Sequence, residues 1–156
     1  MAWTTPKTNW ATGELVTAED MNAVGENLAV LRHPSTAVAA YTTTEDIVLP
    51  GTDSFADIDS DNLNLTITTS GGDVLVQFHG SLSGGSSCIL DVEIDGNRHG
   101  DTEHGVMDVY GWKYTRPIVS FTRLIQNLSA GSHTFKLQAK SSLTLVAGAQ
   151  FWVREL

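Results

Sequence analysis

The chain of 156 residues is long enough for one domain with a hydrophobic core, and 41% of its residues are hydrophobic. It carries 18 Asp and Glu residues against 9 Lys and Arg, a formal net charge of -9, so its long-range field repels nucleic-acid phosphate and anionic lipid. Nucleic acid is therefore not expected as a partner. The single cysteine, Cys88, cannot form an intrachain disulfide, and no apolar run is long enough for membrane insertion.

The first segment in chain order is short and polar, yet it contains two tryptophans. Trp3, Pro6 and Trp10 lie in WTTPKTNW, which is too short to form a core of its own. Such a segment buries a large apolar area only when it packs against a neighbour. The sequence therefore predicts a docking arm that another protein orders.

A helix is predicted to begin after Thr17 and to end before Pro34. Thr17 supplies an N-cap hydroxyl, and Asp20 follows three residues later as in a capping box. An apolar stripe at spacings of three and four runs along this helix and comprises Met21, Val24, Leu28 and Leu31. An isolated helix of about fifteen residues is marginal in water, so the stripe is expected to pack against its own domain, a sister helix or another protein.

After Pro34 the apolar residues alternate with polar ones, as they do in β-strands. The clearest strands are expected at residues 63–69, 73–80, 88–95, 117–128, 133–140 and 143–156, with weaker ones at 38–41, 47–49, 54–58 and 106–110. The first two should form a hairpin around Gly71-Gly72, and the last should be covered on both faces because small residues lie at its middle. This pattern of about eight to ten strands predicts an all-β, two-sheet sandwich.

The sharpest change in composition lies at Arg32-His33-Pro34-Ser35. The domain prediction that follows is residues 1–34 for the docking arm and helix, and residues 35–156 for the sandwich domain.

Two clusters of polar residues are candidate metal sites. Asp57, Asp59 and Asp61 alternate like the first ligands of a calcium loop, but Asn62 stands at the glycine position and Thr68 at the last ligand. An acidic loop is favoured. The second cluster lies in NRHGDTEHG and comprises His99, Asp101, Glu103 and His104. It has neither the His-Glu-x-x-His spacing on a helix nor a pair of cysteines, so a solvated loop is favoured there too.

The remaining polar residues show no catalytic pattern. The chain has no G-x-S-x-G element, and among its acidic residues no pair is distinguished as a glycosidase pair would be. His33, His79 and His133 are scattered, and none has an evident partner. We therefore expect no enzymatic activity, no catalytic or metal-binding residues and no cofactor.

One aromatic group is a candidate contact surface. Tyr110, Trp112 and Tyr114 alternate in DVYGWKYTRP, so on a strand they would share one face. Such a face suits contact with a carbohydrate or a protein, because rings provide rigid area with a polar tip. The alternative is that some of the three rings pack into the sandwich or into a subunit interface.

The opening stretch resembles the amino-terminal segment of many tailed-bacteriophage virion proteins. The matching residues are Trp3, Pro6, Trp10, Gly13, Val16, Thr17, Ala18, Asn22 and Leu28. The closing stretch, LSAGSHTFKLQAKSS followed by FWVREL, is similar to the last hairpin of jelly-roll domains in phage tail fibres, receptor-binding proteins and capsid decoration proteins. The resemblance covers the two ends of the chain and not its middle.

The resemblance implies an all-β jelly-roll β-sandwich, of the tumour-necrosis-factor or C1q type, preceded by a short N-terminal arm and one α-helix. It also implies a non-enzymatic homotrimer, synthesised in the host cytoplasm and located in the virion. Its partners would be other phage virion proteins of the tail or capsid, and a host-surface glycan or protein. A tail-fibre or receptor-binding role is expected first. A capsid decoration protein is the alternative, and a carbohydrate-binding, lectin-like module is a third hypothesis.

Overall fold

The computed structural model describes residues 12–32, 37–49, 51, 53–84, 87–110, 115–140 and 143–156. The chain divides into two units, residues 1–36 and 37–156. The boundary predicted between residues 34 and 35 lies outside the described residues. No helix in the described part of the chain is long and apolar enough to span a membrane.

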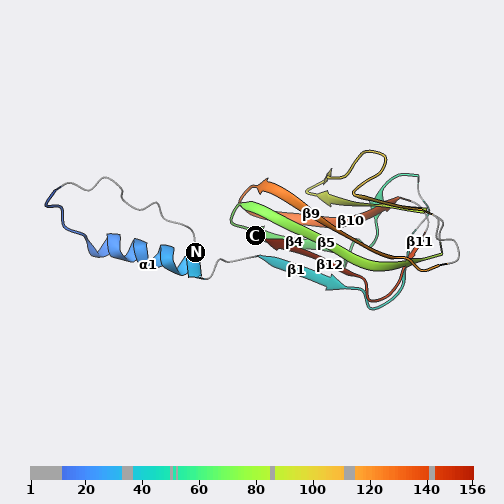
Figure 1. Cartoon of the computed structure of the whole chain (residues 1–156), viewed down its shortest axis with the longest axis horizontal. Helices are drawn as coiled ribbons and strands as arrows, with labels where there is room; N and C mark the ends of the chain where they lie inside the picture. Colours follow the sequence, from blue (N-terminus) through green and yellow to red (C-terminus); the bar gives the residue numbers. More distant parts are fainter. Residues whose placement is uncertain are drawn as a thin grey trace. The chain divides into compact units, whose positions relative to one another are not determined.

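The first unit contains the helix α1 (Ala18–Arg32) (Figure 1). The backbone N–H of Thr17 donates to Asp20 Oδ2 at 2.9 Å, and the N–H of Asp20 donates to Thr17 Oγ1 at 3.2 Å. These reciprocal hydrogen bonds satisfy two donors at the helix start and confirm the predicted cap. Glu19 and Asp20 also place negative charge in the first turn, where the helix dipole favours it.

The second unit is an all-β sandwich of two antiparallel sheets, which confirms the predicted fold class (Figure 1). Its strands within the described residues are β1 (Val38–Thr42), β2 (Ile47–Leu49), β3 (Ala56–Asp57), β4 (Asn64–Thr69), β5 (Gly72–Ser83), β6 (Ser87–Ile94), β7 (Asn97–Arg98), β8 (Met107–Tyr110), β9 (Ile118–Leu128), β10 (Gly131–Lys140), β11 (Leu143–Leu145) and β12 (Gln150–Glu155). These are more strands than the alternation predicted, because several are only two or three residues long.

The strand order is that of a jelly roll. Sheet I contains β1, β12, β5 and β9 in this order, and β11 and β2 continue it beside one end of β5. Sheet II contains β4, β10, β6 and β8, with β3 beside β10 and β7 beside β6. Eight strands remain when the short strands β2, β3, β7 and β11 are set aside. If these eight are numbered 1 to 8 along the chain, sheet I has the order 1-8-3-6 and sheet II has the order 2-7-4-5.

The predicted hairpin of residues 63–69 and 73–80 is wrong. β4 pairs with β10 in sheet II, whereas β5 lies between β12 and β9 in sheet I. Gly71, with φ at 99°, lies where the chain crosses between the sheets, and a Cβ there would be 3.2 Å from the backbone nitrogen of Ala130. Alternation shows which face of a strand is buried, but it does not identify the neighbouring strand.

The closing stretch also differs from expectation. It does not form a hairpin, because β10 lies in sheet II and β12 in sheet I. The strand predicted over residues 143–156 is divided into β11 and β12 by a turn that includes Gly148, with φ at 87°. The small residues of this stretch therefore mark a turn rather than a strand covered on both faces.

The core lies between the two sheets and is centred on phenylalanines. Phe78 of β5 and Phe151 of β12 are buried from sheet I, and Phe135 of β10 is buried from sheet II. Burial of each such ring stabilises the fold by about 1.5–3 kcal/mol. The apolar run CILDVEI around Cys88 is typical of a small buried hydrophobe at this position, and Cys88 is fully buried in this core.

Candidate functional site

The outer face of sheet I is a broad surface with few charges. Along β5, Val74, Val76 and Phe78 are buried, so the residues between them point outward. The strand register places the outward residues in rows across the sheet: Val38, Arg154, Leu75 and Leu124; Ala40, Trp152, Gln77 and Thr122; Thr42, Gln150, His79 and Ser120; and Ser81 with Ile118. Arg154 is the one residue with a permanent charge in these rows.

Several side chains on this face are apolar and reach solvent. Ile118 is 74% exposed, Val38 is 58% exposed and Leu124 is 44% exposed, while Trp152 is half-buried at the centre of β12. Gln77 Nε2 donates to Thr122 Oγ1 at 2.8 Å, so part of the polar surface of the middle row is already satisfied within the sheet. We call the rows of outward residues on β1, β12, β5 and β9 the neutral face.

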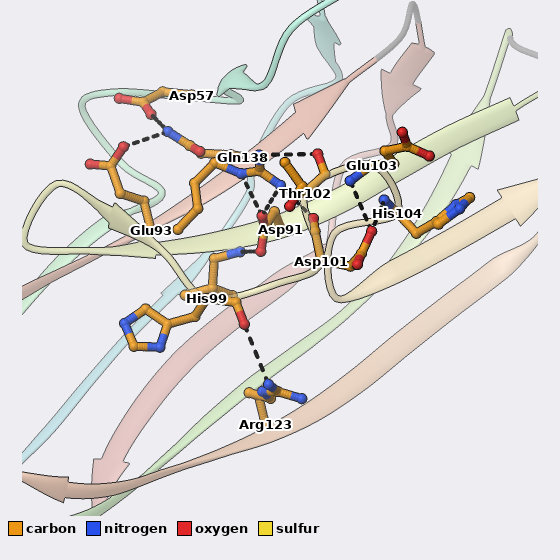
Figure 2. A network of polar contacts seen from close by, with 12 residues as sticks. Asp57, Asp91, Glu93, His99, Asp101, Thr102, Glu103, His104, Arg123 and Gln138 are labelled. Atoms are coloured by element: carbon orange, nitrogen blue, oxygen red, sulfur yellow. Dashed lines mark hydrogen bonds and ion pairs between the residues drawn. The ribbon is translucent and has the colours of Figure 1, made fainter.

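The outer face of sheet II has the opposite character. Lys136 Nζ lies 3.3 Å from Asp57 Oδ2 and 3.1 Å from Glu93 Oε1. Gln138 Nε2 donates to Asp57 Oδ1 and to Glu93 Oε2, at 2.8 Å each (Figure 2). The sequence correctly places Lys136 and Gln138 on the outward side of β10. Gln138 is nevertheless buried, because these charged neighbours cover it.

A buried ion pair lies next to this network. Asp91 of β6 is fully buried, and its Oδ2 accepts a hydrogen bond from Arg98 Nε at 2.7 Å and forms an ion pair with Arg98 Nη2 at 2.6 Å. Asp91 Oδ1 accepts from the backbone N–H of Val92 at 2.7 Å. The Arg98 guanidinium also lies 3.5 Å from the centre of the Phe55 ring. The charge of Asp91 is thus compensated by a guanidinium that contacts Oδ2 through two nitrogens and is itself stacked on an aromatic ring.

Arg98 also fixes the loop of residues 99–106 over the outer side of β6. Its guanidinium donates to the carbonyl oxygens of Asp101 at 2.8 Å and Thr102 at 3.4 Å. Gly100 packs so closely on Asp91 that a Cβ at this glycine would overlap the carboxylate. The loop is therefore held by the same ion pair that it covers.

Asp101 and His104 of this loop bond within the loop and to the adjacent strand β8. Asp101 accepts from the backbone N–H groups of His104 and Glu103, and these bonds lower the pKa of its carboxyl group. His104 Nδ1 lies 2.9 Å from Asp108 Oδ2, and this hydrogen bond raises the pKa of the exposed imidazole. In the described part of the chain, no three or more His, Cys, Asp or Glu side chains are grouped as metal ligands would be.

The three aspartates of SFADIDSDN also do not converge. Asp57 belongs to the network on sheet II, whereas Asp59 accepts hydrogen bonds from the backbone N–H groups of Asp61 and Asn62. Burial acts to raise the pKa of Asp59, but the bonds from Asn62 and Asp61 outweigh it and lower that pKa. Asp59 therefore shapes its own turn.

The residues proposed from sequence for docking and recognition are only partly described. Trp3, Pro6, Trp10, Trp112 and Tyr114 lie outside the described residues.

Tyr110 ends β8 and is 69% exposed, so it is available for contact. On α1, Met21 is 61% exposed and Val24 is 46% exposed, so both are available for packing. Leu28 and Leu31 belong to α1, but their side chains lie outside the described ones.

The environment of Cys88 does not activate its thiol as a nucleophile. Burial, with a smaller contribution from the charge of Asp108, raises the pKa of the Cys88 thiol to about 12. The thiol is therefore protonated at neutral pH and shielded from substrates.

Comparison with known proteins identifies no family for this chain. No protein-family model matches the chain, and no curated protein matches it. Among solved structures, dimeric latent PorU from Porphyromonas gingivalis matches 77% of this chain at 7% identity with a TM-score of 0.37. The match spans 13% of that chain.

Sequence reasoning missed the neutral face as a surface. Its signal was present, because the outward positions of residues 73–80, 118–124 and 150–154 hold few charges in a chain with a net charge of -9. That these positions lie side by side became visible only through the strand register.

Proposed function

We propose that this chain is a non-enzymatic structural protein of a tailed-phage virion that acts as a homotrimer, of the tail-fibre or receptor-binding type. The observation that supports association is the neutral face. Subunit interfaces are depleted of charged residues at their centres, as are the rows around Trp152. The phage assignment is supported by the resemblance of residues 3–28.

Charge explains why copies would meet at this face. Chains with a net charge of -9 repel one another at long range, so association needs a surface on which carboxylates do not oppose each other. The rows of the neutral face contain Arg154 and no carboxylate, and Asp73, the next outward residue at the start of β5, accepts from the backbone N–H of Asn127. On the outer face of sheet II, Asp57 and Glu93 are already paired with Lys136, so contact with a second copy there would desolvate charges that are satisfied within the subunit.

In this proposal each segment has a separate role. Residues 1–34 attach the protein to the particle, and the stripe of α1 packs against sister helices. The jelly roll faces outward, and Tyr110, Trp112 and Tyr114 are the candidate residues for contact with a host glycan or protein.

The copy number in the virion tests the tail assignment. A tail-fibre or receptor-binding protein is expected at far fewer copies than the major capsid protein, which quantitative mass spectrometry of purified particles measures. One or more copies per capsid subunit would contradict the tail-fibre role and favour the decoration alternative.

The helix stripe gives a second prediction. Leu28→Asp places a charge in the stripe, and we expect it to weaken self-association because a buried unpaired carboxylate is costly. Sedimentation equilibrium measures the mass of the assembly over a range of concentrations. Asn27→Asp adds the same charge one position outside the stripe and serves as the control. If both variants keep the parent mass, the stripe is not an interface between copies.

A further inference from the structure

His133 of β10 is buried between two hydrogen-bond acceptors. Its Nδ1 lies 2.7 Å from Asp95 Oδ2, and its Nε2 lies 2.9 Å from the carbonyl oxygen of Ser129. The side chain is 9% exposed. A neutral imidazole carries one N–H and can satisfy only one of these acceptors, whereas the imidazolium ion satisfies both. The geometry therefore fits the charged ring.

The ring joins two turns of the sandwich. Asp95 lies in the turn between β6 and β7 with φ at 51°, and its Oδ1 accepts from the backbone N–H of Thr134 at 2.9 Å. Ser129 lies in the turn between β9 and β10, and its carbonyl also accepts from Thr69 Oγ1 at 2.8 Å. The protonated ring thus holds the Ser129 turn to the Asp95 turn.

Ser129 offers a second partner for the neutral ring. Its hydroxyl oxygen lies 3.5 Å from Nε2, at the limit of hydrogen-bond distance. The Asp95 carboxylate retains the proton on Nδ1, so deprotonation leaves a lone pair on Nε2 that faces the carbonyl oxygen. The hydroxyl can donate to that lone pair only if the Ser129 turn moves closer to the ring.

We propose that His133 is a protonation-dependent clasp, in which the charged ring holds the Ser129 carbonyl and the neutral ring takes the Ser129 hydroxyl instead. The turn of residues 129–131 then has two arrangements that pH selects. This inference is independent of the function proposed above.

The surrounding charges set the pH range. The hydrogen bond with Asp95 raises the pKa of His133, burial opposes it, and the Ser129 carbonyl and the charge of Asp95 raise it further. The bonds from Thr134 and His133 lower the pKa of Asp95, and His99 lowers it slightly from the segment after β7. Asp95 is the charged group that faces the ring.

The direction of each pKa shift determines the pH range in which that group stabilises the fold. Because the pKa of His133 is raised, its stabilisation is complete below the ordinary value of about 6.5 and is lost as pH rises through the raised value. Because the pKa of Asp95 is lowered, its stabilisation is present above about 3.9 and is lost as pH falls through the lowered value. The clasp is therefore fully formed between about pH 4 and 6.5.

Two variants shift the titration in opposite directions. Asp95→Asn keeps an acceptor for Thr134 and suits the positive φ, but removes the charge, so the pKa of His133 should fall by about one unit or more. Ser129→Ala removes the donor to the neutral ring, so the pKa of His133 should rise. NMR titration of the full chain measures both, with His133→Gln to assign the resonance and His79→Gln as an exposed control.

Long-range ¹H–¹⁵N spectra of the imidazole provide the second readout. Above the pKa of His133 the proton should remain on Nδ1, and the amides of residues 129–131 should exchange faster after correction for the intrinsic pH dependence. A neutral ring protonated on Nε2, or a pKa that Ser129→Ala lowers or leaves unchanged, would overturn the clasp.

Discussion

Trp152→Glu is expected to dissociate the assembly into single folded chains. Trp152 lies half-buried at the centre of the neutral face, between Ala40 on β1 and Gln77 on β5. In a homo-oligomer this ring would be covered by another copy, and a glutamate would place a carboxylate without a partner in that contact. Loss of such an aromatic anchor costs about 3 kcal/mol, which corresponds to ~100-fold weaker association.

Sedimentation equilibrium of the full chain measures this effect, and circular dichroism establishes that the variant is folded. The matched control is Thr68→Glu, which adds the same charge at an exposed position of β4 in sheet II. We expect the control to keep the parent mass. A Trp152→Glu protein with the same mass as the control would show that the neutral face is not the contact between copies.

The sequence was sufficient to predict the faces of the strands. The alternation of Leu65 and Ile67, and of Val74, Val76 and Phe78, identified the buried sides correctly, because a strand has a period of two whatever its neighbours are. It did not identify the neighbours. β4 and β5 follow one another closely in the chain and still lie in different sheets, because pairing is decided by packing over the whole core.

Contacts between polar residues that are distant in sequence could not be predicted from sequence motifs. His133 was expected to have no evident partner, yet it pairs with Asp95, 38 residues away. Gln138 was placed outward by alternation, but bonds to Asp57 and Glu93 bury it on that side. No local spacing encodes such contacts, since they depend on which strands and turns the fold brings together.

Sequence patterns whose contacts lie within a few residues predicted the structure more reliably than patterns that depend on distant strands. The Thr17 and Asp20 cap was found from four residues, because both of its hydrogen bonds lie within one helical turn. Asp95-Gly96 is likewise a dipeptide typical of tight hairpin turns, and the register of β6 and β7 places a turn there by pairing Ile94 with Asn97. The turn at Gly148 was missed because its neighbours are apolar and continue the pattern of a strand.

The two outer faces of the sandwich support different tasks. Charged side chains on sheet II are satisfied within the subunit, as by Lys136 with Asp57 and Glu93. The neutral face of sheet I leaves Ile118 and Val38 exposed, and burial of this area requires another molecule. Sheet II therefore contributes to the stability of the single subunit, and sheet I offers surface for association.

Arg98→Ala is expected to give the largest loss of stability among single changes on sheet II. It leaves the fully buried Asp91 carboxylate without its cationic partner, releases the 99–106 loop and removes the stacking on Phe55. Removal of one member of a buried pair costs about 3–5 kcal/mol, and because Arg98 is 28% exposed we expect about 3 kcal/mol. Urea unfolding at several protein concentrations measures it separately from association.

Two further variants test whether the loss of stability in Arg98→Ala comes from the buried, unpaired charge of Asp91. Asp91→Ala combined with Arg98→Ala removes both partners, so the double variant should be more stable than Arg98→Ala alone. Lys136→Ala breaks a more exposed pair and should cost no more than about 1 kcal/mol. If the double variant is less stable than Arg98→Ala, or if Arg98→Ala costs no more than Lys136→Ala, then Arg98 does not stabilise the fold by neutralising Asp91. The loop would then be held by the close packing of Gly100 and Gly105 on β6.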